Sequence, residues 1–170
     1  MPFDELELLF DDLTHEPTPD QINSMLNHFL NDFVTNPFQI NDVDVIVKVQ
    51  PSLNRWFRGK PETFVHLITR ESKYRNGREF DHLRANRIHW VKPILLNHAS
   101  PRINYFEYAD SNKVVCNHYW LEEKDFMVVV KPIHPDFLVI TAFCIDSNHE
   151  KQRYRGRFNE FYQGKKNALR

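Results

Sequence analysis

The sequence predicts an α+β fold, with N-terminal helices followed by an antiparallel sheet and with helices packed mainly on one face of that sheet. Two observations lead to this prediction. Apolar residues recur at helical spacing near the start of the chain, and four short runs of β-branched and aromatic residues follow one another from Ile103 onward. The chain has 170 residues, of which 41% are hydrophobic and 26% charged, a composition typical of a folded protein.

The first part of the chain predicts two helices. Residues 3–13 combine apolar side chains at helical spacing with an acidic opposite face, which indicates a short amphipathic helix. Thr18, Pro19 and Gln21 then form the start of a second helix, with Thr18 as its N-cap. The apolar stripe of this helix consists of Ile22, Met25, Leu26, Phe29, Leu30 and Phe33. Such a clean stripe predicts a helix that covers the sheet.

The middle of the chain predicts two early strands and another helix. Alternating valines in residues 42–49 indicate a half-buried strand that ends at Pro51. The apolar run 63–69 resembles a second strand, and Gly77 marks a turn after it. A helix is expected over residues 81–96, with its last turn kinked or shortened by Pro93.

The C-terminal part predicts a four-stranded antiparallel meander over residues 103–108, 114–121, 126–130 and 137–145. Alternation along the last strand places Thr141 on the same face as Phe137 and Phe143. Ser147 and Glu150 form a capping box for a final helix, and Gly164 is its expected stop.

Charge divides the chain into two expected parts. Residues 1–47 contain 10 acidic residues and no lysine or arginine, which suggests an acidic, mainly helical part packed on the main domain. Residues 48–170 hold all 22 lysines and arginines against 13 acidic residues, a surplus of nine positive charges. The surplus predicts either a surface that binds a polyanion or only a chance difference between solvated faces.

Several classes of function are not supported by the sequence. The spacings of zinc ligands and the glycine-rich loops of nucleotide-binding sites are missing, so we expect neither a metal site nor a small-molecule cofactor. Cys116 and Cys144 lie in predicted strands and are expected to be free thiols. Apolar runs are too short to span a membrane and the N-terminus is acidic, so we expect a cytoplasmic protein without a membrane partner.

The richest source of candidate site residues is the segment 65–96. Its cations include four arginines that we take as candidate ligands of phosphate or RNA: Arg70, Arg75, Arg84 and Arg87. Arg84 and Arg87 share the apolar stripe of the predicted helix. Because burying an unpaired guanidinium is costly, each must meet an acid, reach the rim of the core or line a phosphate site.

The candidate catalytic residues are His66, His89 and Thr141. His66 lies in an apolar run, where a polar side chain requires a partner. His82 and His89 are seven positions apart and would project alike from one helix, and imidazoles suit proton transfer near neutral pH. Thr141 is a lone hydroxyl in an apolar strand. For each residue alone, a structural role is the competing interpretation.

Several motifs together resemble one superfamily: HLITRESKYRNGREF, LRANRIHWVKPIL, INYFEY, YWLEE and LVITAFCID. Residues 62–162 are similar to the phage- and toxin-associated ribonucleases of the barnase–EndoU–colicin–RelE superfamily. The resemblance implies a compact α+β domain that cleaves RNA without a metal. It also implies His66 as the base, Arg70, Arg84 and Arg87 as phosphate-binding cations, and His89 as a second acid or base.

The same resemblance matches Thr141 to a hydroxyl residue common in the last strand, where relatives often have T-A-Y. Here Phe143 replaces that tyrosine and removes one possible acid.

We therefore expect a metal-independent endoribonuclease that yields a 2′,3′-cyclic phosphate. The implied setting is a toxin or phage-derived effector with RNA, tRNA included, as substrate and an immunity or antitoxin protein as partner. The alternative is a non-catalytic nucleic-acid-binding or regulatory module on the same fold. A third hypothesis is that the acidic N-terminal part covers the basic face or contacts a partner.

Overall fold

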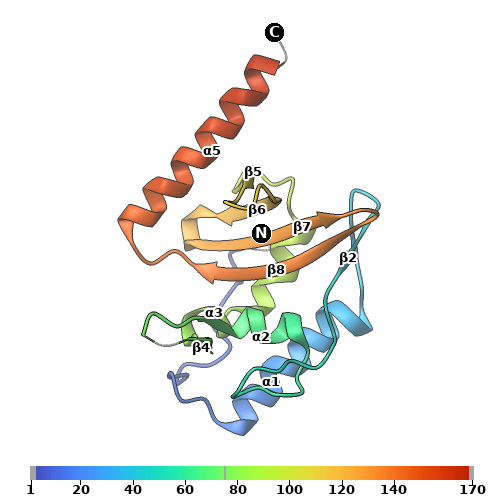
Figure 1. Ribbon diagram of the computed structural model, residues 1–170, viewed down its shortest axis with the longest axis vertical. Helices are drawn as coiled ribbons and strands as arrows, with labels where there is room; N and C mark the ends of the chain where they lie inside the picture. Colours follow the sequence, from blue (N-terminus) through green and yellow to red (C-terminus); the bar gives the residue numbers. More distant parts are fainter. Residues whose placement is uncertain (1–2, 75, 169–170) are drawn as a thin grey trace.

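The computed structural model describes residues 3–74 and 76–168, with a six-stranded sheet between two layers of helices (Figure 1). The strand order is β1-β2-β8-β7-β6-β5, and β3 pairs with β4 in a small second sheet. The strands are β1 Gln39–Ile40, β2 Val43–Ile46, β3 Thr69–Glu71, β4 Arg78–Phe80, β5 Ile103–Ala109, β6 Val115–Leu121, β7 Phe126–Ile133 and β8 Asp136–Cys144. The α-helices are α1 Pro19–Leu30, α2 Glu62–Ile68, α3 His82–Ala85, α4 Val91–Leu96 and α5 Asn148–Ala168. The predicted α+β fold class is confirmed.

The four C-terminal strands form the predicted antiparallel meander. The sheet as a whole is mixed, however, because β2 runs parallel to β8, with Val45 opposite Phe137 and Ile46 opposite Leu138. A long stretch of chain separates these two strands, so no hairpin imposes the antiparallel direction on them. The expectation of a purely antiparallel sheet is corrected on this point.

Beyond Leu138, none of the described strands pairs with β8 on the side of β2. Helices α2 and α3 pack against β8 instead (Figure 1). The second half of β8, which contains Thr141, is therefore an edge that faces helices.

A register shift in β8 corrects the predicted face of Thr141. Val129 is opposite Thr141 whereas Val130 is opposite Val139, which leaves Ile140 as an extra residue. Such a bulge reverses the alternation of side chains along the strand. Phe137 and Val139 accordingly join one hydrophobic cluster, whereas Phe143 and Ile145 join the other.

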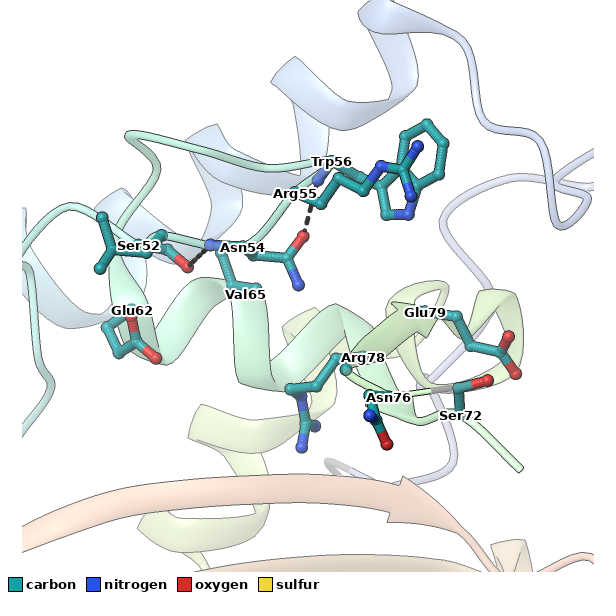
Figure 2. Close-up of a pocket in the computed structure, with 12 residues that line it drawn as sticks. Ser52, Asn54, Arg55, Trp56, Glu62, Val65, Ser72, Asn76, Arg78 and Glu79 are labelled. Atoms are coloured by element: carbon teal, nitrogen blue, oxygen red, sulfur yellow. Dashed lines mark hydrogen bonds between the residues drawn. The ribbon is translucent and has the colours of Figure 1, made fainter. Parts of the chain in front are cut away.

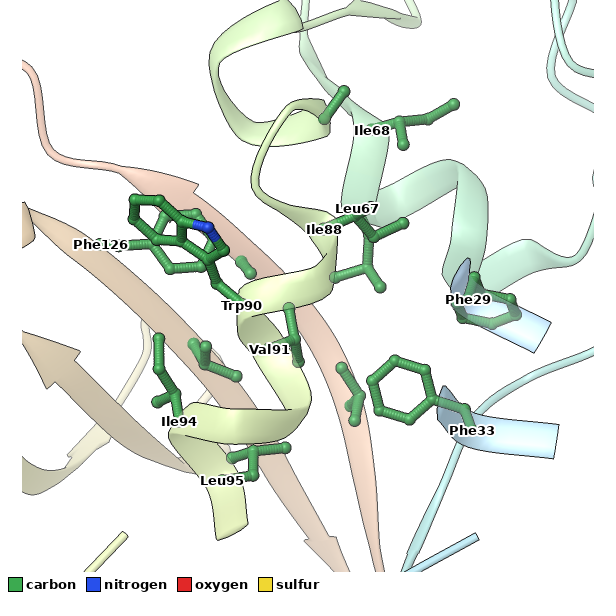
Figure 3. Close-up of a cluster of buried hydrophobic side chains, with 14 of the residues drawn as sticks. Phe29, Phe33, Leu67, Ile68, Ile88, Trp90, Val91, Ile94, Leu95 and Phe126 are labelled. Atoms are coloured by element: carbon green, nitrogen blue, oxygen red, sulfur yellow. The ribbon is translucent and has the colours of Figure 1, made fainter. Parts of the chain in front are cut away.

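The larger hydrophobic cluster lies between the sheet and helices α1, α2 and α4 (Figure 3). Phe29 from α1, Leu67 and Ile68 from α2 and Ile94 from α4 are all buried completely or almost so. The Trp90 indole packs edge-to-face on Phe126 of β7, with ring centroids 5.4 Å apart. This cluster also includes Phe3 and Leu13, so the acidic N-terminal part contributes to the same core as the basic part.

Helix α5 covers the opposite face of the sheet, where Tyr154 packs with Phe106, Trp120 and Met127. The prediction that helices lie mainly on one face therefore holds for α1 to α4 and not for α5. Glu150 N–H donates to Ser147 Oγ at 3.1 Å, as expected at the start of this helix. The helix continues through Gly164, which is not its stop. Among the described helices, none has an apolar stretch long enough to cross a bilayer.

Helix α1 begins as predicted. Thr18 Oγ1 accepts a hydrogen bond from Gln21 N–H at 3.1 Å, and Gln21 Oε1 accepts one from Thr18 N–H at 2.9 Å. This reciprocal capping box satisfies two backbone donors at the helix start. A π-helical turn, Asn31–Thr35, extends the helix and keeps Phe33 in the core.

Residues 3–13, which we call the N-terminal strap, form turns instead of the predicted helix. Asn86 binds the backbone of Phe10 through both side-chain atoms, each at 2.8 Å, and the Trp90 indole N–H donates to the Glu7 carbonyl at 2.9 Å. These tertiary bonds occupy backbone groups that a helix would use. A helix of this length is marginal by itself, so the tertiary contacts decide the conformation.

The segment 63–69 is also not the strand we expected, because residues 62–68 form helix α2. Thr63, Phe64, Val65, Leu67 and Ile68 are all buried. A short helix buried on nearly every side has an unbroken apolar run, as a buried strand has, so periodicity does not distinguish them.

The helix predicted over residues 81–96 is broken. Helix α3 is followed by a 3-10 turn, Ile88–Trp90, and then by α4. The break lies at Asn86 and Arg87, where Asn86 turns to bind the strap. Pro93 lies in the first turn of α4, where its missing N–H has no intrahelical acceptor to lose.

We predict that Asn86→Ala lowers the free energy of unfolding by about 2 to 3 kcal/mol, because two part-buried backbone groups of the strap lose their partners. Urea denaturation measures this change. The exposed Asn27→Ala on α1 is the control and should change stability by less than about 0.5 kcal/mol. An equally small effect of Asn86→Ala would contradict the anchoring role.

Candidate functional site

The candidate site is built around the carbonyl oxygen of Thr69, at the junction of α2 and β3. Arg84 Nη1 donates to this oxygen at 2.7 Å and Arg78 Nη2 donates to it at 2.8 Å. Arg78 reaches it from β4 and Arg84 from α3. Two guanidinium groups are thus held side by side next to the edge of β8.

Arg84 connects α3 to the sheet. Its Nη1 also donates to Thr141 Oγ1 at 3.2 Å, and its Nε lies 3.3 Å from Asp81 Oδ2. The side chain is only 13% exposed. Burial lowers the pKa of this guanidinium, and Asp81 opposes that shift. Arg84 is therefore a buried, acid-paired cation that positions the Thr141 hydroxyl.

Arg78 has different partners. Its Nε donates to Thr69 Oγ1 at 2.9 Å, so both of its hydrogen-bond acceptors among the described residues are uncharged oxygens of Thr69. Burial lowers its pKa, as does the nearby Arg84, while Glu71 and Glu62 act in the opposite direction. Arg78 was not among the residues selected from the sequence. It belongs to the basic segment 65–96, and it follows the predicted turn at Gly77.

His66 lies beside this pair on α2. Its Nε2 is 3.2 Å from Glu62 Oε1, one helical turn earlier. Burial lowers the pKa of His66, Arg78 lowers it further, and Glu62 opposes both effects. The neutral ring is thus favoured at pH 7. In the tautomer that donates Nε2–H to Glu62, Nδ1 is a hydrogen-bond acceptor and can take a proton.

A cavity of about 470 Å³ lies between the loop 51–61 and the β3–β4 hairpin (Figure 2). Glu62 of α2 and Arg78 of β4 line one side of it, and Arg55 and Trp56 line it from the loop. Trp56 is 59% exposed, and the Arg55 guanidinium lies 4.9 Å from the centre of its ring. Asn54 Oδ1 accepts a hydrogen bond from Trp56 N–H at 2.9 Å and so fixes the loop. The cavity therefore presents cations together with a surface for stacking.

Of the remaining candidate arginines, the structure describes Arg70 and Arg87. Arg70 is at the rim on β3, where its Nε is 3.3 Å from Glu79 Oε1. Arg87 donates from Nη1 to the Leu83 carbonyl at 2.6 Å, and its guanidinium lies 5.2 Å from the centre of the Trp90 ring. It has no described bond to Thr69 or Thr141. Arg75 lies outside the described residues.

His89 has separate surroundings. Its ring lies 5.8 Å from that of His28 and 6.4 Å from that of Trp90. Burial lowers the pKa of His89 to about 4, although the backbone of Glu7 in the N-terminal strap acts to raise it. Within the described part of the chain, it contacts neither His66 nor Arg78. Hydrogen bonds therefore connect Arg84, Thr141, Arg78 and Thr69, and Arg78 acts electrostatically on His66. His89 and Arg87 have no described bond to this group.

Two other kinds of chemistry have little support. The described residues contain no group of three or more His, Cys, Asp or Glu placed to hold a metal ion. Burial raises the pKa of the Cys144 thiol to about 11, although Arg87 and Arg84 oppose the shift. A thiol with so high a pKa is a poor nucleophile at neutral pH.

Comparison of this chain with protein-family models, curated proteins and solved structures finds no match. The relation to the ribonuclease superfamily therefore remains a prediction from the sequence motifs.

Because the pKa of His89 is about 4 in the folded chain and ordinarily 6.5, the unfolded chain binds a proton first as the pH falls. We predict that the free energy of unfolding declines as the pH falls from 6.5 to 4. His89→Gln should make this decline smaller by roughly 2 kcal/mol, a figure reduced because the partly exposed ring is screened by solvent. Urea denaturation across this pH range measures it. The exposed His149→Gln is the control, and an equal acid-induced loss in both variants would refute the prediction.

Proposed function

We propose that this protein is a metal-independent endoribonuclease whose reaction centre lies at His66, Arg78 and Thr141. The observation that carries the proposal is the convergence of Arg78 and Arg84 on one carbonyl oxygen beside a histidine oriented by a glutamate. A scissile phosphate needs positive charge around its oxygens and a base beside the ribose. Arg78 lines the first cavity together with Glu62, the ion-pair partner of His66, and the charge of Arg78 acts on the His66 ring.

In the proposed reaction, Nδ1 of His66 takes the proton of the ribose 2′-hydroxyl. The 2′-oxygen then attacks the adjacent phosphorus while the bond from phosphorus to the 5′-oxygen breaks. Arg78 stabilises the charge on the phosphoryl oxygens. Because His89 lies elsewhere, the leaving 5′-oxygen takes its proton from water. The products are a 2′,3′-cyclic phosphate and a 5′-hydroxyl.

Thr141 and Arg84 have a positioning role in this scheme. Thr141 Oγ1 accepts the hydrogen bond of Arg84, which leaves its own O–H as a donor. We assign that donor to a phosphoryl oxygen. Arg84 adds positive potential, but its charge is balanced by Asp81, so it contributes less than Arg78.

A second candidate function is RNA binding without cleavage. It is favoured by the ion pairs of Arg84 with Asp81 and of Arg70 with Glu79, which reduce the charge available for a transition state. The position of His89, away from the centre, also leaves no second imidazole near His66 among the described contacts.

The biological setting rests on the sequence resemblance alone. It implies a toxin or phage-derived effector that acts on cytoplasmic RNA, tRNA among the possible substrates, with an immunity or antitoxin protein as partner. The acidic N-terminal part is held to the core by the strap contacts and supplies Phe3 and Leu13 to it. This architecture favours a structural role for the strap over a detachable cover.

We predict that the purified protein cleaves RNA in the presence of EDTA and that the new 3′-ends carry a 2′,3′-cyclic phosphate. Replacing the ribose at the cleaved position by 2′-deoxyribose should abolish cleavage there, because the attacking hydroxyl is lost. Mass spectrometry of the fragments identifies the ends. A 3′-hydroxyl and 5′-phosphate at the cut would contradict this mechanism.

We predict that His66→Gln lowers kcat by about 100-fold or more, because the general base is lost while a hydrogen bond to Glu62 remains possible. Arg78→Met should lower kcat by about 100-fold. Circular dichroism and urea denaturation check that each variant folds, and His149→Gln is the matched control with wild-type activity expected. If the wild-type protein binds RNA but never cleaves it, the second candidate function replaces the first.

A further inference from the structure

We propose that a second cavity, next to the first, is a subsite for one unpaired nucleobase of the RNA strand whose phosphate lies at Arg78. This inference deepens the proposed function and rests on it. The cavity has a volume of about 810 Å³ and lies between residues 15–23, the loop 51–61 and the β3–β4 hairpin. Its size falls within the range of about 300–1000 Å³ of pockets that hold small organic groups.

The two cavities are contiguous. Trp56 and Glu79 line both of them. The first cavity contains Arg78 on the side of the reaction centre, and the second extends away from it toward Ile22 of α1. A polymer that places a phosphate at Arg78 therefore has a neighbouring hollow for its next unit, with Trp56 at the boundary (Figure 2).

The walls of the second cavity suit a flat apolar group. Phe57 and Phe80 form one wall, with ring centroids 6.1 Å apart, and Pro19 and Ile22 contribute from α1. A nucleobase has two apolar faces and a polar edge, so it gains by stacking on such side chains. Most of the Trp56 surface is exposed, and so it is available for a second ring in addition to the Arg55 guanidinium.

The margin of the cavity has charges of both signs. Lys60 and Arg70 line it together with Glu16 and Glu79, and Arg55 stands beside it on Trp56. These cations fit the phosphates on either side of a bound base. The Glu79 carboxylate accepts from Arg70 and holds this cation at the boundary between the cavities. The combination of aromatic walls with charged groups at the margin favours a nucleotide over an apolar peptide.

The subsite implies a preference for single-stranded RNA. A base inside a duplex is stacked and paired on both strands, and it enters a pocket only after it is extruded at a cost of a few kcal/mol. A loop or unpaired end avoids this cost. The neighbour of the cleaved bond should therefore be an unpaired nucleotide.

The test uses the full chain and a short single-stranded RNA made resistant to cleavage by 2′-O-methylation. A series of such RNAs carries one abasic nucleotide at successive positions, and fluorescence anisotropy measures each Kd. One position next to the bound phosphate should weaken binding about tenfold when its base is removed, because stacking of one base is lost. Trp56→Ala should weaken binding of the intact RNA by a similar factor but have little further effect on that abasic RNA.

Tyr162→Ala is the matched control, since this aromatic side chain is 53% exposed on α5 and lines neither cavity. It should leave every Kd unchanged. Independent, additive losses from the abasic position and from Trp56→Ala would overturn the subsite, as would equal binding of all abasic RNAs. RNA that does not bind at all would overturn the subsite and the proposed function together.

The subsite and the reaction are separable in this design. If the effects of Trp56→Ala and of one abasic position on Kd are not additive, and unmodified RNA is not cleaved, the subsite is supported and the nuclease is rejected. Cleavage with no base dependence would support the nuclease and reject the subsite.

Discussion

Two positively charged groups share one carbonyl oxygen in this protein, and the organisation of the candidate site follows from that contact. The Thr69 carbonyl accepts hydrogen bonds from Arg78 and from Arg84. This carbonyl oxygen joins the end of α2 to the β3–β4 hairpin and to α3. Arg84 extends the connection to Thr141 at the edge of β8. Like charges so close repel each other, and the protein offsets the repulsion with Asp81 beside Arg84 and with the more distant Glu62 and Glu71. A bound phosphate would add negative charge beside these two cations.

Local signals predicted several parts of the fold correctly. The capping box at Thr18 and Gln21 defines a helix start by hydrogen bonds between near neighbours, so its sequence pattern suffices. The C-terminal strands are regular, and their turns are short, so they appear in the sequence as separate β-branched runs. For the candidate site, His66, Arg84 and Thr141 were selected by their type and surroundings in the sequence. In the structure Arg84 donates a hydrogen bond to Thr141, and Arg78, which shares the Thr69 carbonyl with Arg84, acts electrostatically on His66.

The errors come from contacts that the sequence does not display. The alignment of His82 with His89 assumed a continuous helix, and the break at Asn86 and Arg87 removes it. That break depends on a partner 76 positions away, the strap residue Phe10. The extra residue Ile140 in β8 likewise depends on the register with β7 and changes which side chains share a face. Helix α2 was predicted as a strand because full burial hides its period.

The N-terminal strap has a consequence for the synthesis of this protein. Its anchors, Asn86 and Trp90, follow their strap partners by 76 and 83 positions. During translation, Phe3, Leu6 and Leu13 therefore remain exposed to solvent until roughly eighty further residues have been added. Exposed apolar segments are prone to aggregate at this stage. The acidic residues between these apolar side chains make the straps of different chains repel each other, which opposes their association.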